Sequence, residues 1–139
     1  MTGYVSVELR RLVRQHFSDR CAYCQTAEAL TVSIFEIEHI IPRSSNGPTV
    51  FENLCLACPT CNRYKSNHTE VVLANETVCE LYHPHRYQWD EHFDWSVAGT
   101  RIVGLTDVGR VTIDLMRMNR PQVVSVRELW VDAGRHPPS

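Results

Sequence analysis

The chain has 139 residues, of which 43% are hydrophobic and 22% charged, and its formal net charge is −2. This length suits one domain with a true core, so we predict a single domain over residues 1–139. The charge argues against an indiscriminate nucleic-acid binder, which is usually strongly basic, and no apolar run approaches the roughly 18 residues of a membrane span. The first half is the more basic, because residues 1–68 carry seven Lys and Arg against six Asp and Glu.

The beginning of the chain also bears on its compartment. It contains Arg10, Arg11 and Arg14 and lacks the continuous apolar block of a signal peptide. We therefore predict a cytoplasmic protein that does not enter a membrane. Thiols in a reducing compartment stay free unless a metal binds them, so the six cysteines are first interpreted as metal ligands.

The first half shows helix, strand and loop patterns in turn. Apolar residues at helical spacing predict an amphipathic helix from Ser6 to Asp19, with Ser6 as its N-cap. Isoleucine and valine residues between Leu30 and Ile41 predict strand structure, and the composition of Pro42 to Pro48 predicts a loop. A short helix is expected to begin around Pro59 to Asn62.

Beyond His68 the patterns are weaker and predict a hairpin, two helices and a tail. The hairpin joins Phe93–Val97 to Arg101–Leu105, the helices run from Thr106 to about Met118 and from Pro121 to Ala133, and the loose tail is Arg135 to Ser139.

Two pairs of cysteines have the spacing of a zinc site. Cys21 and Cys24 form one C-x-x-C pair, and Cys58 with Cys61 forms another after 33 intervening residues. Cys55 and Cys58 have the same spacing, so spacing alone leaves the second pair open. Four thiolates that converge on one ion make a closed tetrahedral zinc centre with no place for a reacting water, which stabilises a fold and catalyses nothing. Buried free cysteines are the alternative.

Between and after these pairs lies a second pattern, with Glu38 and His39 first, Asn53 and Leu54 next, and Asn62 directly after Cys61. In this order the residues resemble the HNH nuclease motif, over about residues 18–68. The resemblance implies an α+β fold with a ββα-metal core, followed by a family extension over about residues 80–135. It also selects Cys58 and Cys61 as the second zinc pair.

The resemblance further implies the role of each residue. His39 would be the general base, Asn53 would orient it, and Glu38 with Asn62 would bind the catalytic metal. The chemistry is suitable, since a neutral histidine accepts a proton near neutral pH and oxygen ligands suit Mg²⁺ or Mn²⁺. The motif departs from the family at two positions, because Asn62 replaces the last histidine and Glu38 replaces an aspartate and is one methylene longer.

We therefore expect a metal-dependent endonuclease that hydrolyses DNA phosphodiester bonds. Arg43, Arg63 and Lys65 flank the motif and are predicted to contact DNA phosphates, although ordinary surface charge would explain each of them equally well. One alternative is a non-catalytic zinc-ribbon module that binds nucleic acid or protein, and another is an inactive HNH scaffold. The sequence leaves the oligomeric state and the DNA specificity open.

Overall fold

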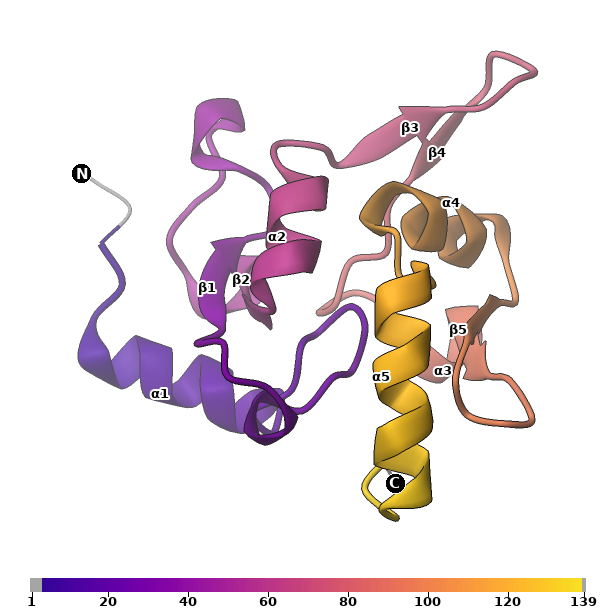
Figure 1. Cartoon of the computed structure of the whole chain (residues 1–139). Helices are drawn as coiled ribbons and strands as arrows, with labels where there is room; N and C mark the ends of the chain where they lie inside the picture. Colours follow the sequence, from indigo (N-terminus) through magenta and orange to yellow (C-terminus); the bar gives the residue numbers. More distant parts are fainter. Residues whose placement is uncertain (1–3, 139) are drawn as a thin grey trace.

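A computed structural model describes residues 4–138 of the chain (Figure 1). Its helices and strands, in chain order, are α1 (Val7–His16), β1 (Glu36–His39), β2 (Leu54–Ala57), α2 (Pro59–Lys65), β3 (Glu70–Val72), β4 (Val78–Glu80), α3 (Trp89–His92), β5 (Phe93–Trp95), β6 (Ile102–Gly104), α4 (Asp107–Met116) and α5 (Pro121–Asp132). Short 3-10 turns lie at Glu28–Leu30, Arg43–Ser45 and Phe51–Asn53. Among the described helices, none is long and apolar enough to cross a membrane.

The centre of the first half is an antiparallel hairpin of β1 and β2 that contacts helix α2. In its register Glu36 lies opposite Ala57 and His39 lies opposite Leu54. Every residue of β2 is buried, which explains why this strand is a continuous apolar run without the alternation of a half-exposed strand. The hairpin, the following helix and a four-cysteine cluster confirm the predicted α+β class with a zinc site.

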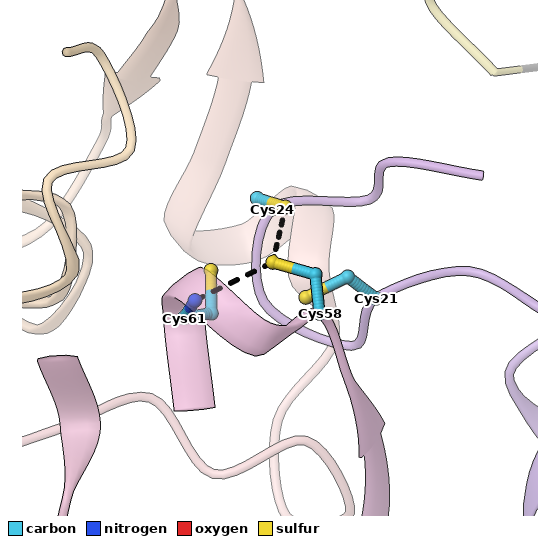
Figure 2. A group of neighbouring side chains, drawn as sticks. All are labelled: Cys21, Cys24, Cys58 and Cys61. Atoms are coloured by element: carbon cyan, nitrogen blue, oxygen red, sulfur yellow. Dashed lines mark hydrogen bonds between the residues drawn. The ribbon is translucent and has the colours of Figure 1, made fainter. Parts of the chain in front are cut away.

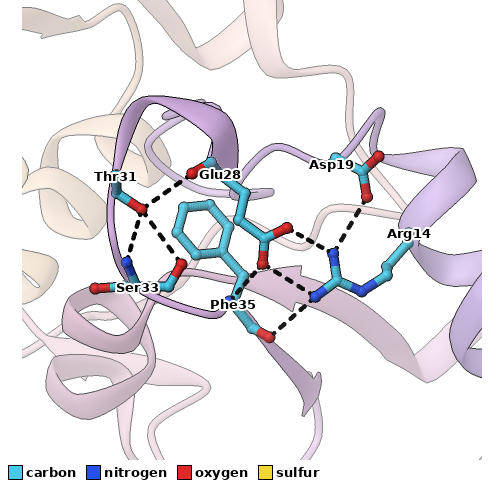
Figure 3. A network of polar contacts seen from close by, with 6 residues as sticks. All are labelled: Arg14, Asp19, Glu28, Thr31, Ser33 and Phe35. Carbon is cyan, nitrogen blue, oxygen red and sulfur yellow. Dashed lines mark hydrogen bonds and ion pairs between the residues drawn. The ribbon is translucent and has the colours of Figure 1, made fainter.

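Helix α1 packs against β2 as an amphipathic element (Figure 1). The Ser6 side chain accepts a hydrogen bond from the backbone N–H of Leu9, as predicted for the N-cap, and Val13 is completely buried. Arg14 binds both carboxylate oxygens of Glu28, at 2.9 and 3.0 Å, and Glu28 also accepts the backbone N–H of Phe35 (Figure 3). This bidentate pair therefore holds the segment that leads into β1 against helix α1.

The second half adds two further hairpins and two longer helices. The predicted hairpin at residues 93–105 and the two predicted helices are present as β5–β6, α4 and α5, and Thr106 caps α4 as expected. The sequence did not predict the β3–β4 hairpin, which projects from the body of the molecule in Figure 1. Helix α4 packs on α2, and one buried cluster contains side chains from both halves of the chain.

The predicted loose tail is wrong at His136. This side chain is only 6% exposed, and its ring packs on Trp95 and Trp130 at centroid distances of 4.5 and 5.7 Å. Polar composition suggested a mobile end, but an imidazole ring can cover an aromatic surface as well as meet solvent. Ser139, the last residue of that prediction, lies outside the described residues.

Candidate functional site

The four cysteines of the two predicted pairs lie together (Figure 2). Their sulfur atoms are all within 4.8 Å of one another, and all four residues are buried. The first pair sits on a turn closed by the backbone bond from Cys21 N–H to Thr26 O. In the second pair Cys58 is the N-cap of α2 and Cys61 lies in the first turn of that helix, so the helix start presents both thiols to one point.

This donor set fits a zinc ion. Zinc–thiolate bonds of about 2.3 Å imply sulfur–sulfur distances of about 3.8 Å in a tetrahedron, and Cys24 Sγ lies 3.9 Å from Cys58 Sγ. The four cysteines are thus positioned to bind a structural zinc ion. Cys55, the alternative partner of Cys58, points elsewhere, because its thiol lies 3.3 Å from Glu38 Oε2. Burial raises the pKa of the Cys55 thiol well above its ordinary value.

His39 ends strand β1 and remains partly exposed. Its Nε2 atom is 2.8 Å from the hydroxyl oxygen of Thr49, a residue of the loop that follows. Burial, and secondarily the positive charge of Arg43, lower the pKa of His39 below its ordinary value. The imidazole is therefore mainly neutral near pH 7, which is the state that can accept a proton.

Asn53 fixes the loop between His39 and Thr49. Its side chain is buried, accepts the backbone N–H of Ile41 at 2.9 Å, and donates to the carbonyls of Ile41 and Pro48 at 3.0 and 2.9 Å. The resemblance implied that Asn53 hydrogen-bonds near His39 and fixes its orientation, and its side-chain hydrogen bonds go to the backbone of the adjoining loop. Asn53 can thus orient His39 only indirectly, by holding the loop that carries Thr49.

Glu38 of strand β1 and Lys65 of helix α2 form a buried ion pair. Their side chains are 6% and 1% exposed, and Lys65 Nζ lies 3.3 Å from Glu38 Oε1 and donates to Ile40 O at 2.8 Å. Tyr23 donates its hydroxyl to Glu38 Oε2 at 2.8 Å. Burial raises the pKa of the Glu38 carboxyl, against the opposing effects of Lys65 and Tyr23. The expected metal ligand and the expected DNA contact are therefore bonded to each other inside the protein.

Asn62 meets a different carboxylate. Its side-chain amide donates to Oε1 of Glu36 at 2.6 Å, and Glu36 is exposed. The structure thus brings the expected ligand Asn62 together with a glutamate to which the sequence interpretation gave no role. In strand β1 Glu36 and Glu38 lie two residues apart, so both face the same side of the hairpin.

The basic residues near the motif are not equally accessible. Arg43 and Arg63 are exposed, and among residues 4–138 neither has an acidic group within ion-pair distance. Arg117, from the second half, lies over the ring of Tyr64 on α2 with its guanidinium carbon 4.6 Å from the centroid. Exposed cations without acidic partners are suited to phosphate contacts. Of the three predicted DNA contacts, Arg43 and Arg63 are therefore the two that remain accessible to a phosphate.

Comparison with known proteins gives the class to which this geometry belongs. Residues 21–68 match the family model of the HNH endonucleases. Over residues 21–68 the chain is therefore similar to the HNH endonucleases, as the motif predicted. A CRISPR-associated endonuclease Cas9 from Corynebacterium diphtheriae is similar to this chain, with 39% identity over 62 residues. That similarity covers 44% of this chain but only 6% of the length of the Cas9 protein. No solved structure matches the chain significantly.

Sequence reasoning missed several residues that the structure places at the site. The sequence interpretation gave no role to Tyr23 or Thr49, yet they contact Glu38 and His39. Glu36 could have been found from the sequence, because strand alternation puts it on the same face as Glu38. The contacts of Tyr23 and Thr49 depend on tertiary structure and carry no local signal.

Proposed function

We propose that the chain is a metal-dependent endonuclease that hydrolyses DNA phosphodiester bonds, with His39 as general base. The observation that carries the proposal is the state of His39, which is partly exposed, bonded to Thr49 and mainly neutral near pH 7, within a domain of the HNH endonuclease family. The similarity to an endonuclease supports a nuclease activity in general. We propose further that residues 1–139 act as one domain, in which the second half packs on the first.

The proposed roles follow from the positions of the side chains. With His39 Nε2–H donating to Thr49, the lone pair of Nδ1 can take a proton from the attacking water. Asn53 holds the loop in place, and Arg43 and Arg63 contact the phosphates beside the scissile bond. Zinc at the four cysteines has no part in the chemistry, because a centre with four thiolate ligands leaves no open position.

A divalent cation bound by both Asn62 and a carboxylate of β1 would neutralise the negative charge that builds on the phosphate and its leaving oxygen. Oxygen donors favour Mg²⁺ or Mn²⁺ over softer ions. Glu38 is the carboxylate that the motif suggests, and Glu36 is the one that the hydrogen bond from Asn62 suggests. Both belong to the same face of β1, so the proposed location of the cation is common to the two assignments.

The test is cleavage of supercoiled plasmid DNA by the zinc-loaded protein with added Mg²⁺ or Mn²⁺. We expect nicked or linear product with the wild-type protein, no product with excess EDTA, and at most about 1% of the rate with His39→Ala. A mutant with normal folding and full activity would overturn the role of His39. No cleavage by any metal-loaded wild-type sample, together with retained DNA binding, would favour the non-catalytic zinc-ribbon module.

A further inference from the structure

Arg117 ends helix α4 and reaches across to helix α2, which contacts α4 (Figure 1). Its guanidinium carbon lies 4.6 Å from the ring centroid of Tyr64, and its Nη1 atom lies 3.5 Å from the hydroxyl oxygen of that tyrosine. The side chain is exposed, and within the described part of the chain no carboxylate lies at ion-pair distance from it. Arg117 therefore presents an unneutralised positive charge where the two halves of the chain meet.

The backbone of Arg117 is left-handed, with φ 51° and ψ 49°. Glycine is the usual residue where a helix ends in this conformation, because a Cβ atom is disfavoured there. The residues that follow are held firmly. Asn119 exchanges two hydrogen bonds with the backbone of Ile102, and Arg127 donates to the carbonyl oxygen of Met118. The fold thus keeps an arginine at a position that favours glycine, which points to a use for its side chain.

The surface of helix α2 connects Arg117 to the proposed cleavage site. Successive residues of a helix are rotated by about 100°, so Asn62, Arg63 and Tyr64 follow one another around its circumference. Asn62 bonds strand β1, and Tyr64 contacts Arg117. The exposed Arg63 lies between these two positions. A helix with its side chains is roughly 10–12 Å across, so the separation of Arg117 from Asn62 is on the order of one helix diameter.

We propose that Arg117 binds a DNA phosphate and, with Arg63, extends the DNA-binding surface onto the second half of the chain. The inference rests on the proposed action on DNA. Duplex DNA carries about one negative charge per 1.7 Å of its axis, so several phosphates lie within a distance of one helix diameter from the scissile bond. The ring of Tyr64 holds the guanidinium in place before DNA binds, through a cation–π contact, and this reduces the conformational entropy lost on binding.

The test measures binding of a labelled DNA duplex by fluorescence anisotropy at several salt concentrations, with zinc-loaded protein and no added Mg²⁺ or Mn²⁺. Arg117→Gln should weaken binding about tenfold, the effect of one charge-assisted hydrogen bond. The loss should be equal for unrelated sequences, because a phosphate contact carries no sequence information. The magnitude of the slope of log K against log salt concentration should fall by about 0.9, the value for one neutralised phosphate.

Arg110→Gln is the matched control, because it removes the same charge from an exposed residue of α4 that is already paired with Asp107 at 2.8 Å. It should keep the wild-type affinity and salt slope. Arg117→Lys retains the positive charge and should also keep the salt slope. A lysine variant with the slope of Arg117→Gln would contradict a phosphate contact.

A purely structural contact between α4 and α2 would give a different result. Arg117→Gln would then lower the thermal midpoint, while its affinity and salt slope would equal those of Arg110→Gln. That outcome would overturn the proposal, and so would a wild-type protein that does not bind DNA. Plasmid cleavage is scored separately. A wild-type protein that binds DNA through Arg117 but never cuts it would refute the nuclease function and leave this interface intact, and a protein that cuts DNA while Arg117→Gln binds like the control would do the reverse.

Discussion

Lys65 Nζ lies 3.3 Å from Glu38 Oε1, in a pair whose side chains are only 1% and 6% exposed. The pair joins the last turn of α2 to strand β1, and the lysine also bonds Ile40 O, one residue after the proposed base. Tyr23 completes the arrangement from the turn that carries the first two cysteines. The cysteine cluster, helix α2 and strand β1 are thus connected through one buried carboxylate.

Lys65→Met should severely destabilise the fold, because it leaves the Glu38 carboxylate buried without its cation. Removal of one partner from a buried ion pair usually reduces the free energy of unfolding by about 3–5 kcal/mol. Urea denaturation should show this loss, and Arg63→Met, an exposed neighbour on α2, is the matched control. The double variant Lys65→Met/Glu38→Gln should recover part of the stability. Equal stability of the Lys65 and Arg63 variants would contradict the buried pair.

The cysteine cluster should hold one zinc ion per chain. Cys61→Ser removes one of four converging ligands and should unfold the domain, since structural zinc contributes on the order of 10 kcal/mol to the folding of small domains. Cys55→Ala is the matched control, because this buried thiol lies beside Glu38 and outside the cluster. Elemental analysis should find zinc in the control and little in the Cys61 variant. A folded wild-type sample without zinc would refute the prediction.

Arg127 should stabilise the second half of the chain, near the cysteine cluster. Its side chain is fully buried and donates to Thr100 O at 3.0 Å and to Met118 O at 2.7 Å. Burial lowers the pKa of Arg127, and the charge of the cluster cysteines opposes that effect. Arg127→Met leaves these two carbonyl oxygens without hydrogen-bond donors, which should reduce the free energy of unfolding by about 1–3 kcal/mol. The thermal midpoint should fall by several degrees, and zinc should pass to a chromogenic chelator faster than in the control Arg120→Met. Unchanged melting and zinc transfer would exclude this role.

Gly47 should be necessary for the loop that positions Thr49 beside His39. A Cβ at this position would overlap the carbonyl oxygen of Ile41 and crowd the Asn53 amide. Gly47→Ala must therefore move the loop, and small misplacements near a reacting group can reduce rates by about 10²-fold. Plasmid cleavage should show this loss while zinc content stays normal. Ser44→Ala, an exposed change in the same loop, is the control, and equal rates for both variants would count against the loop's role.

The longer helices and the cysteine cluster could be predicted from the sequence because their signals are local. Ser6 and Thr106 cap helices by side-chain hydrogen bonds within a few residues, and the cysteine spacings fix where two turns can meet. The same local pattern matched the HNH family model. The predicted endonuclease class is therefore supported by the comparison, although the individual catalytic roles remain proposals.

Tertiary contacts account for what the sequence did not predict. The motif points to Glu38 as a metal ligand and to Lys65 as a DNA contact, but helix packing turns both side chains inward to each other. The β3–β4 hairpin was missed because its residues have no strong alternation and its turn lacks glycine. His136 illustrates the same limit, since its burial depends on Trp95, far away in sequence, as well as on the nearby Trp130.

His39 is the residue whose removal should reduce catalysis most and affect structure least. A positioned general base contributes about 10² to 10⁴ in rate, and the partly exposed imidazole makes one side-chain hydrogen bond, to Thr49. His39→Ala should therefore keep its zinc, its thermal midpoint and its DNA affinity while losing most of its cleavage rate. A folded variant with near-normal cleavage would exclude His39 as the base, and an unfolded variant would indicate a structural histidine.

The pH dependence of cleavage provides an independent check on the same residue. His39 must be neutral to accept a proton, so the wild-type rate should rise with pH through its pKa and level off above it. Burial and Arg43 lower that pKa below its ordinary value, so the rise should occur on the acid side of neutrality. Arg43→Gln removes a positive charge that disfavours the imidazolium, and its profile should shift to higher pH. Single-turnover rates at saturating DNA measure both profiles, because saturation separates the pKa of the base from the loss of a phosphate contact. A shift to lower pH in Arg43→Gln, or an unchanged acid limb in the residual activity of His39→Ala, would assign the titration to another group.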